Sequence, residues 1–151
     1  YLGDGALNQG QVHEAMNMAA LWALPVIYVI ENNNYAMGTS VDRGSALAGD
    51  LYKIGEPLGI PGRQVDGMDV AAVKQTGDKA VAAVRAGSGP QILEMMTYRY
   101  RGHSMSDPAK YRAREEVQKM RNERDPIDAV QEVAGPGVPG LVCRGCVCYS
   151  V

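Results

Sequence analysis

One acid and one amide are the residues of this chain whose types and spacing best suit metal chemistry. Asp4 stands between two glycines in GDGALNQG (residues 3–10), and Asn33 follows 29 positions later within ENNN (residues 31–34). A glycine-rich loop lets backbone amides approach a phosphate, but a carboxylate there would repel that phosphate. A magnesium ion held by the carboxylate, the amide oxygen and a nearby main-chain carbonyl would turn the repulsion into attraction, because magnesium prefers oxygen ligands and joins protein groups to phosphates.

The elements that carry these two residues can be read from hydrophobic periodicity. Apolar residues recur at helical spacing over 12–23, and Pro25 is expected to end that helix. The apolar run VIYVI (26–30) is typical of a parallel strand covered on both faces. A right-handed crossover from strand through helix to strand would then place Asp4 and Asn33 side by side at the carboxyl edge of the sheet, where open α/β sheets bind ligands.

A second unit of the same kind follows. We expect a short strand at 63–65, a helix from the N-cap Asp69 to residue 86, and a strand at 91–97. Alternating strands and helices predict the α/β class: an open, mostly parallel sheet with helices on both faces, incomplete at the N-terminus. The connection 35–62 is expected to be long and irregular, with one helical turn near residues 50–54.

The rest of the chain predicts a loop, two helices and an atypical tail. Residues 97–108 are polar and without period, residues 112–122 form a charged helix, and Asp125 caps a last helix that opens with proline. The tail 135–151 differs in composition and holds all three cysteines. We therefore expect one partial domain over 1–134, and the tail is not a favoured zinc site because zinc takes four ligands and both histidines lie far upstream.

Composition excludes several classes of function. The 151 residues are 46% hydrophobic and 21% charged, which is typical of a globular domain. A formal net charge of -2 gives no electrostatic basis for binding nucleic acid, and no apolar run is long enough to span a membrane. The expected setting is intracellular, with small molecules or proteins as partners. The chain opens on Tyr1 and Leu2, which read as the end of a strand, so we expect a fragment.

Four longer segments carry a resemblance to a known family. They are GDGALNQGQVHEAMNMAALWALP, ENNNYAMGTSVDR, IPGRQVDGMD and TYRYRGHSMSDPAKYR. Together they resemble the alpha subunits of pyruvate dehydrogenase, in the thiamine diphosphate-dependent 2-oxoacid dehydrogenase family, from residue 1 to about residue 133. The resemblance implies the thiamine diphosphate-binding fold and two cofactors, thiamine diphosphate and Mg²⁺.

The resemblance also implies roles for individual residues. Asp4 and Asn33 would ligate magnesium by their side chains, and Tyr35 would do so by its main-chain carbonyl. The residues implied to bind the cofactor are Asp4, Gly5, Ala6, Asn33 and His103. Gly5 and Ala6 would touch the diphosphate, and His103 would be a catalytic residue in an active-site loop near it.

The activity implied by the resemblance is oxidative decarboxylation of pyruvate with acetyl transfer to lipoyl groups on a dihydrolipoyl acyltransferase core. A beta subunit would complete an alpha2beta2 heterotetramer and supply the activating glutamate, so the isolated chain is expected to be inactive. The bacterial cytoplasm is the expected location, or the mitochondrial matrix in a eukaryote. Ser104 and Ser40 match positions that mitochondrial relatives phosphorylate, but DPAKYR (107–112) lacks a further serine of those relatives and looks bacterial.

Other hypotheses remain open on sequence alone. An acetoin or branched-chain 2-oxoacid dehydrogenase alpha subunit shares the same motifs, and a truncated product could be non-catalytic. A nucleotide-binding module is a further alternative, with Glu31 as the acid that follows a second strand, although three asparagines after it suit a metal better. Arg99, Arg101 and Arg112 could contact phosphate or simply solvate their loop.

Overall fold

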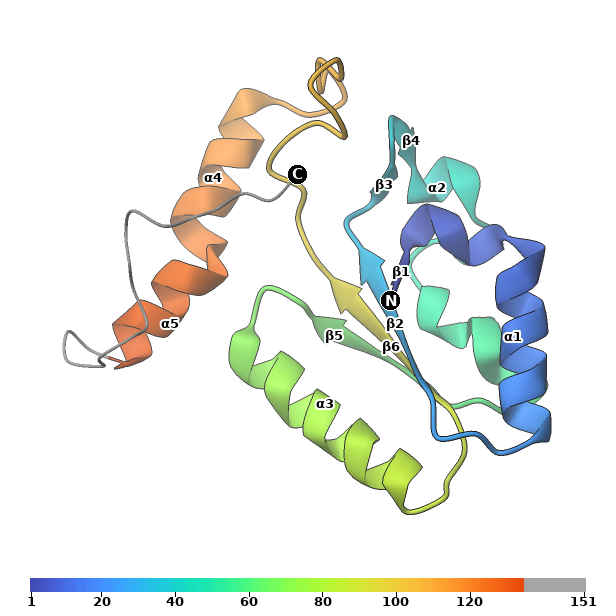
Figure 1. The fold of residues 1–151 in the computed structure, drawn as a ribbon. Helices are drawn as coiled ribbons and strands as arrows, with labels where there is room; N and C mark the ends of the chain where they lie inside the picture. The colour runs from blue at the N-terminus through green and yellow to red at the C-terminus, as the bar shows by residue number, and fades with distance from the viewer. Residues whose placement is uncertain (135–151) are drawn as a thin grey trace.

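The computed structural model describes residues 1–134, which form a four-stranded parallel sheet covered by helices (Figure 1). The strands lie in the order β1 (Leu2–Gly3), β2 (Ile27–Asn32), β6 (Gln91–Met96) and β5 (Gly62–Asp66). All three neighbouring pairs are parallel. The predicted α/β class with a mostly parallel sheet is confirmed.

The two main helices cover opposite faces of this sheet. Helix α1 (Gly10–Leu21) joins β1 to β2, and α3 (Val70–Arg85) joins β5 to β6. These two connections cross the sheet in opposite directions, since β1 to β2 and β5 to β6 both run inward. Right-handed crossovers in opposite directions place their helices on opposite faces, as Figure 1 shows for α1 and α3.

Side-chain alternation along the strands builds one apolar core on each face. Ile30 and Ile92 are fully buried on the α1 side, whereas Leu93 and Met95 point to the α3 side. The first core also contains Leu7, Met16, Val41, Leu51 and Ile60, and the second contains Val65 and Ala80. A parallel sheet buried on both faces follows from this pattern.

Local signals set the ends of the helices. Helix α3 begins after Asp69, whose carboxylate accepts hydrogen bonds from the backbone amides of Ala71 and Ala72, and Gly87 follows its end with a φ of 86°. Helix α1 ends at Leu21, four residues before Pro25. The predicted N-cap is therefore confirmed, and the first helix stops before the proline instead of at it.

The connection 35–62 is more regular than predicted. It contains the hairpin strands β3 (Tyr35–Ala36) and β4 (Thr39–Ser40), the short helix α2 (Val41–Gly44) and the 3-10 helix η2 (Leu51–Leu58). The predicted helical turn near residues 50–54 is confirmed, since it lies within η2, which extends four residues further. The prediction that the rest of the connection is irregular was wrong, because strands of two residues leave no periodicity in the sequence.

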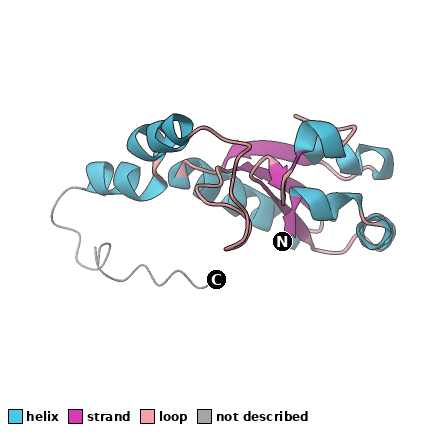
Figure 2. Cartoon of the chain, turned by 90° about the horizontal axis from the view of Figure 1, so that it is seen from above, coloured by secondary structure: helices cyan, strands magenta, loops and turns pink. Residues whose placement is uncertain are grey.

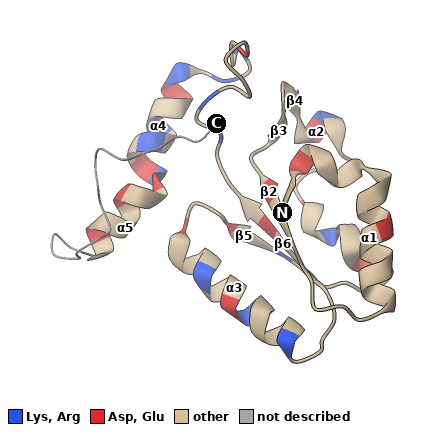
Figure 3. Ribbon diagram, viewed as in Figure 1, with Lys and Arg blue, Asp and Glu red and all other residues tan. Residues whose placement is uncertain are grey.

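The last described part stands beside the carboxyl ends of β5 and β6. Helices α4 (Arg114–Arg124) and α5 (Pro126–Ala134) are set apart from the sheet, as Figure 2 shows from above. Figure 3 shows charges of both signs along α4, which has no buried residue. None of the helices within residues 1–134 is both long and apolar enough to cross a bilayer. The predicted tail 135–151 lies outside the described residues.

Candidate functional site

The structure brings Asp4 and Asn33 together at the carboxyl edge of the sheet. Gly3 pairs with Glu31 in register, so the next residues of the two strands leave the sheet side by side. Asp4 opens the 3-10 helix η1 (Asp4–Asn8) and is only 5% exposed. Burial raises the pKa of its carboxyl, while its own backbone amide, the charge of Arg99 and the backbone amide of Asn33 act in the opposite direction.

Asparagine side chains shape the turn that follows β2. The Oδ1 atom of Asn32 accepts a hydrogen bond from the amide of Asn34 at 2.9 Å, and Oδ1 of Asn33 accepts one from the amide of Tyr35 at 3.1 Å. Asn34 has a φ of 68°, a conformation that asparagine tolerates better than most residues. The run of three asparagines therefore folds as two successive side-chain-capped turns.

The main-chain carbonyl of Tyr35 faces a cation from another strand. Arg99 follows β6, and its Nη2 donates to the Tyr35 oxygen at 2.8 Å while Nη1 donates to the Met37 oxygen at 2.9 Å. Sequence reasoning left Arg99 undecided between phosphate and solvent. The position of Arg99 between Tyr98 and Tyr100, just after a strand, was the only sequence signal that it has a structural role. No sequence pattern indicated that it binds the carbonyls of the hairpin.

The three predicted ligand groups fit a magnesium ion in chemistry. A carboxylate, an amide oxygen and a carbonyl oxygen are all hard donors, and each amide or carbonyl oxygen keeps a second lone pair beside the hydrogen bond it accepts. The Asp4 carboxylate is buried, and two backbone amides and the charge of Arg99 offset its desolvation only in part, so a bound cation would stabilise it further. Residues 1–134 contain no group of three or more acidic, histidine or cysteine side chains arranged to hold a metal ion.

Gly5 and Ala6 lie in the first turn of η1, beside the hairpin β3–β4. A Cβ atom added at Gly5 would overlap the Cβ of Ala36, so packing excludes a side chain there. A cavity of about 150 Å³ lies next to this contact and is lined by residues that include Asp4, Gly5 and Ser40. The glycine thus allows the loop after β1 to approach the hairpin closely.

The loop that carries His103 is held by Asp107. Its carboxylate accepts hydrogen bonds from the amide of His103 at 2.7 Å, the amide of Ala109 at 2.9 Å and the hydroxyl of Tyr111 at 2.8 Å. The first of these bonds contributes most to holding the pKa of Asp107 below its usual range. The imidazole of His103 is exposed, and no hydrogen bond or ion pair within residues 1–134 joins it to the carboxylate of Asp4.

A tyrosine cage around Arg112 ties this loop to the turn after β2. The guanidinium carbon lies 5.7 Å from the ring of Tyr35 and 5.2 Å from the rings of Tyr98 and Tyr111, and Nη2 donates to the carbonyl of Arg101 at 3.0 Å. These distances are within cation-π range, and the Nε and Nη1 atoms of Arg112 are buried without a hydrogen-bond acceptor. Arg112 therefore packs between tyrosine rings, although its residue type alone would suggest a solvent-exposed side chain.

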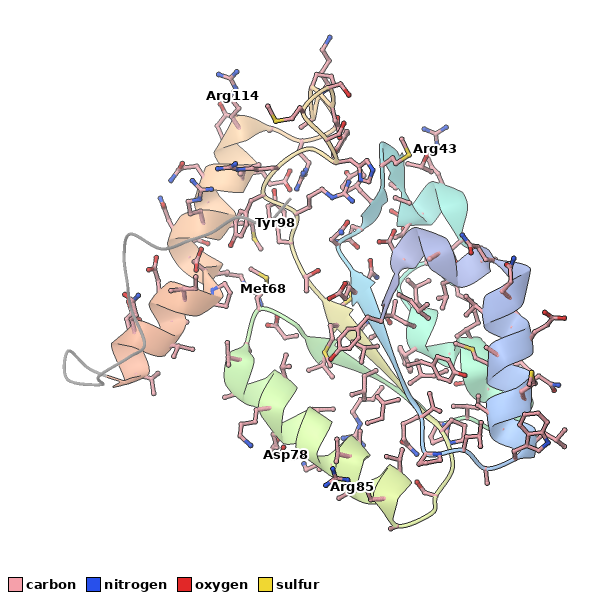
Figure 4. The ribbon with its side chains drawn as sticks, viewed as in Figure 1. Arg43, Met68, Asp78, Arg85, Tyr98 and Arg114 are labelled. Atoms are coloured by element: carbon pink, nitrogen blue, oxygen red, sulfur yellow. The ribbon has the colours of Figure 1, made fainter. Side chains whose placement is uncertain are left out.

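Tyr98 also connects the loop to α4. Figure 4 shows this tyrosine on the segment after β6, between the sheet and α4. Its hydroxyl donates to Oε1 of Glu116 at 2.9 Å. Burial first, and the Glu116 acceptor second, raise the pKa of Tyr98 to about 12.

The two serines considered for phosphorylation differ in setting. Ser104 is exposed in the His103 loop, with its hydroxyl 3.0 Å from that of Ser106. Ser40 is half-buried, pairs with Tyr35 in the hairpin, and lines the cavity beside Asp4. Phosphorylation at either position stays a prediction.

Comparison with known proteins places this chain in a family. The sequence model of the family described as "Dehydrogenase E1 component" matches residues 1–134. The chain belongs to that family. The dehydrogenase E1 resemblance seen in the four sequence segments is thus confirmed, and with it the family that the GDG and ENNNY motifs predicted.

Two bacterial relatives of this dehydrogenase E1 chain are named "Pyruvate dehydrogenase E1 component subunit alpha", and a mitochondrial relative has the same name followed by "mitochondrial". The protein of Rhizobium meliloti (strain 1021) is 68% identical over 131 residues, which are 87% of this chain and 37% of the relative. That of Zymomonas mobilis is 59% identical over 140 residues, 92% of this chain and 39% of the relative. A mitochondrial form from Sminthopsis macroura is 57% identical over 126 residues, 83% of this chain and 34% of the relative. The chain therefore spans less than half the length of these relatives.

Proposed function

We propose that this chain is part of a pyruvate dehydrogenase alpha subunit and binds Mg²⁺ and the diphosphate of thiamine diphosphate. The observation that carries the proposal is the convergence of the buried Asp4 carboxylate with the Asn33 turn at the carboxyl edge of a parallel sheet. The printed name of the relatives, at 57–68% identity, supports the same activity.

Each residue has a defined part in this proposal. Asp4 and Asn33 would hold the ion by side-chain oxygens and Tyr35 by its carbonyl, while the backbone of Gly5 and Ala6 would lie against the diphosphate. When bound, thiamine diphosphate supplies the electron sink for decarboxylation of a 2-oxo acid.

His103 has a separate part as a catalytic residue. Its exposed imidazole would reach the bound cofactor from a loop that Asp107 keeps in shape.

The reaction of the whole enzyme needs more than this chain. We propose pyruvate as substrate, lipoyl groups of an acyltransferase core as acetyl acceptors, and a beta subunit as partner. The beta subunit would provide the carboxylate that engages the far end of the cofactor.

The chain alone should therefore turn over no pyruvate with an artificial electron acceptor, and addition of a beta subunit should produce turnover. Turnover by the lone chain would contradict the proposed division of the site.

Calorimetric titration of thiamine diphosphate, with and without Mg²⁺, tests the binding proposal. We expect binding that depends on Mg²⁺ and that weakens at least about tenfold in Asp4→Ala and in Asn33→Ala, because each variant removes a ligand that no neighbour replaces. Asp78→Ala is the matched control, since Asp78 is an exposed acid on α3, paired with Lys74. Figure 4 shows Asp78 on the far side of the sheet from α1.

Three results would contradict the proposal. They are binding that ignores Mg²⁺, equal affinities in wild type and Asp4→Ala, and an equal loss in the Asp78→Ala control. Binding of NAD without a metal would instead support the nucleotide-binding alternative. Comparison of pyruvate with branched-chain 2-oxo acids, in the presence of a beta subunit, would decide the acyl preference.

A further inference from the structure

Glu94 is a carboxylate buried in the middle of the sheet. It lies on the central strand β6, has no exposed surface, and is in none of the ion pairs found among residues 1–134. Its oxygens accept three hydrogen bonds from neutral donors: Nδ2 of Asn32 at 2.7 Å, the amide of Tyr52 at 3.1 Å and Nε2 of Gln64 at 3.2 Å. Burying a carboxyl group costs desolvation free energy that neutral hydrogen-bond donors offset only in part, so Glu94 is better explained by what it does for its partners than by packing.

Asn32 connects this carboxylate to the turn that follows β2. Its side chain is 1% exposed and is held at both ends, since Nδ2 donates to Glu94 and Oδ1 accepts from the amide of Asn34 at 2.9 Å. Oε1 of Glu94 accepts from the Asn32 NH₂ group and the Asn34 amide donates to the Asn32 oxygen, so the two partners fix which way the Asn32 amide faces. Two hydrogen bonds thus lead from the core of the sheet to the turn that contains Asn33.

We propose that Glu94 is a positioning residue for the metal-binding turn and acts through the orientation of the Asn32 amide. The inference rests on the proposed function, because it assigns Glu94 to the same Asp4 and Asn33 site. Glu94 fixes Asn32, Asn32 fixes the amide of Asn34, and the backbone amide of Asn33 is thereby held at the Asp4 carboxylate. Groups that hold metal ligands in place in this way typically change metal affinity by about 10- to 100-fold when altered.

The variant Glu94→Gln tests the orientation argument. Two donors, from Tyr52 and Gln64, meet Oε2 of Glu94, and only Asn32 meets Oε1. A glutamine should therefore turn its oxygen toward the two donors and its NH₂ group toward Asn32. The Asn32 amide must then either keep its orientation and lose its bond to residue 94, or turn over and lose its bond to the amide of Asn34. In both cases Asn32 loses one of the two hydrogen bonds that fix its orientation.

A second substitution should repair this loss. In the pair Asn32→Asp with Glu94→Gln, the new carboxylate accepts from the glutamine NH₂ and from the amide of Asn34, and the total charge equals that of the wild type. Asn32→Asp alone instead places two buried carboxylates at the present 2.7 Å separation. We expect Mn²⁺ affinity, measured by electron paramagnetic resonance with thiamine diphosphate present, to be about equal in wild type and the double variant. Each single variant should bind at least about tenfold more weakly.

The Asn32→Asp variant separates positioning from simple charge. An added negative charge near a cation site would strengthen Mn²⁺ binding through space, whereas loss of position weakens it. The matched control is Gln64→Leu, which removes a different partner of Glu94 without touching Asn32 and should stay within about twofold of wild type. Affinity in Asn32→Asp equal to or above wild type, or an equal loss in Gln64→Leu, would overturn the proposal.

Hydrogen exchange decides the question if Asn32→Asp does not give the circular dichroism spectrum of the wild type. In Glu94→Gln we expect the amide of Asn34 to exchange at least about tenfold faster, and in the double variant to regain its protection. Faster exchange at Tyr52 alone, with Asn34 still protected, would refute the role of Asn32. Absence of Mn²⁺ binding in the wild type, or no loss in Asp4→Ala, would instead refute the proposed function itself.

Discussion

Replacing Gly5 by alanine should separate the packing role of this glycine from its proposed role at the diphosphate. The new Cβ would overlap the Cβ of Ala36, which is a short side chain that cannot rotate away. Overpacking of this kind costs about 1–3 kcal/mol. At about 2.1 cal/mol/K per residue, the 134 described residues give an unfolding entropy of about 0.28 kcal/mol/K. The melting temperature of Gly5→Ala should therefore fall by about 4–11 °C, measured by circular dichroism.

The reciprocal variant gives the control. Adding Ala36→Gly removes the opposing methyl group, and a glycine in a strand costs only about 0.5–1 kcal/mol, so the double variant should melt within about 4 °C of wild type. Its Mg²⁺-dependent affinity for thiamine diphosphate should also return, because the added Cβ points at the hairpin and not at a ligand. An unchanged melting temperature in Gly5→Ala, or an equal loss in the double variant, would refute the packing argument.

Three further outcomes follow from single contacts. Asp107→Asn should speed hydrogen exchange at the amide of His103, because that amide donates to the ionised carboxylate. In the wild type the His103 amide should exchange faster only when the pH falls through the lowered pKa of Asp107. Glu116→Gln should lower the pKa of Tyr98 from about 12, followed by ultraviolet absorbance, whereas an unchanged titration would show that burial alone sets it. Asp69→Ala removes the N-cap of α3 and should cost about 1 kcal/mol, or about 4 °C in melting temperature.

The sequence predicts the parts of this fold that depend on neighbours along the chain. The helix period before Pro25, the apolar strand after it and the cap at Asp69 each follow from local chemistry, and the structure agrees within a few residues. The meeting of Asp4 and Asn33 was also predictable, because one crossover connects their strands and its hand is nearly invariant.

The supporting residues of the site were beyond such reasoning. Asn32 and Glu94 are 62 positions apart, and they meet only because β2 pairs with β6 in a register that nothing local specifies. Arg99 reaches Tyr35 from 64 positions away, across a hairpin too short to leave a pattern. Long-range pairing between strands, rather than the motif itself, determines what surrounds the predicted ligands.

Tyr35 belongs to two parts of the site at once. Its carbonyl is the oxygen proposed for the metal and now accepts from Arg99, while its ring stacks on Tyr111 at 4.6 Å and lies over Arg112. The backbone of this residue therefore cannot shift for a ligand without moving the surface on which the His103 loop rests. The coupling is reciprocal by thermodynamic linkage. If ordering of the His103 loop strengthens ion binding by some free energy, ion binding stabilises the ordered loop by the same free energy, so ion occupancy and loop order should increase together.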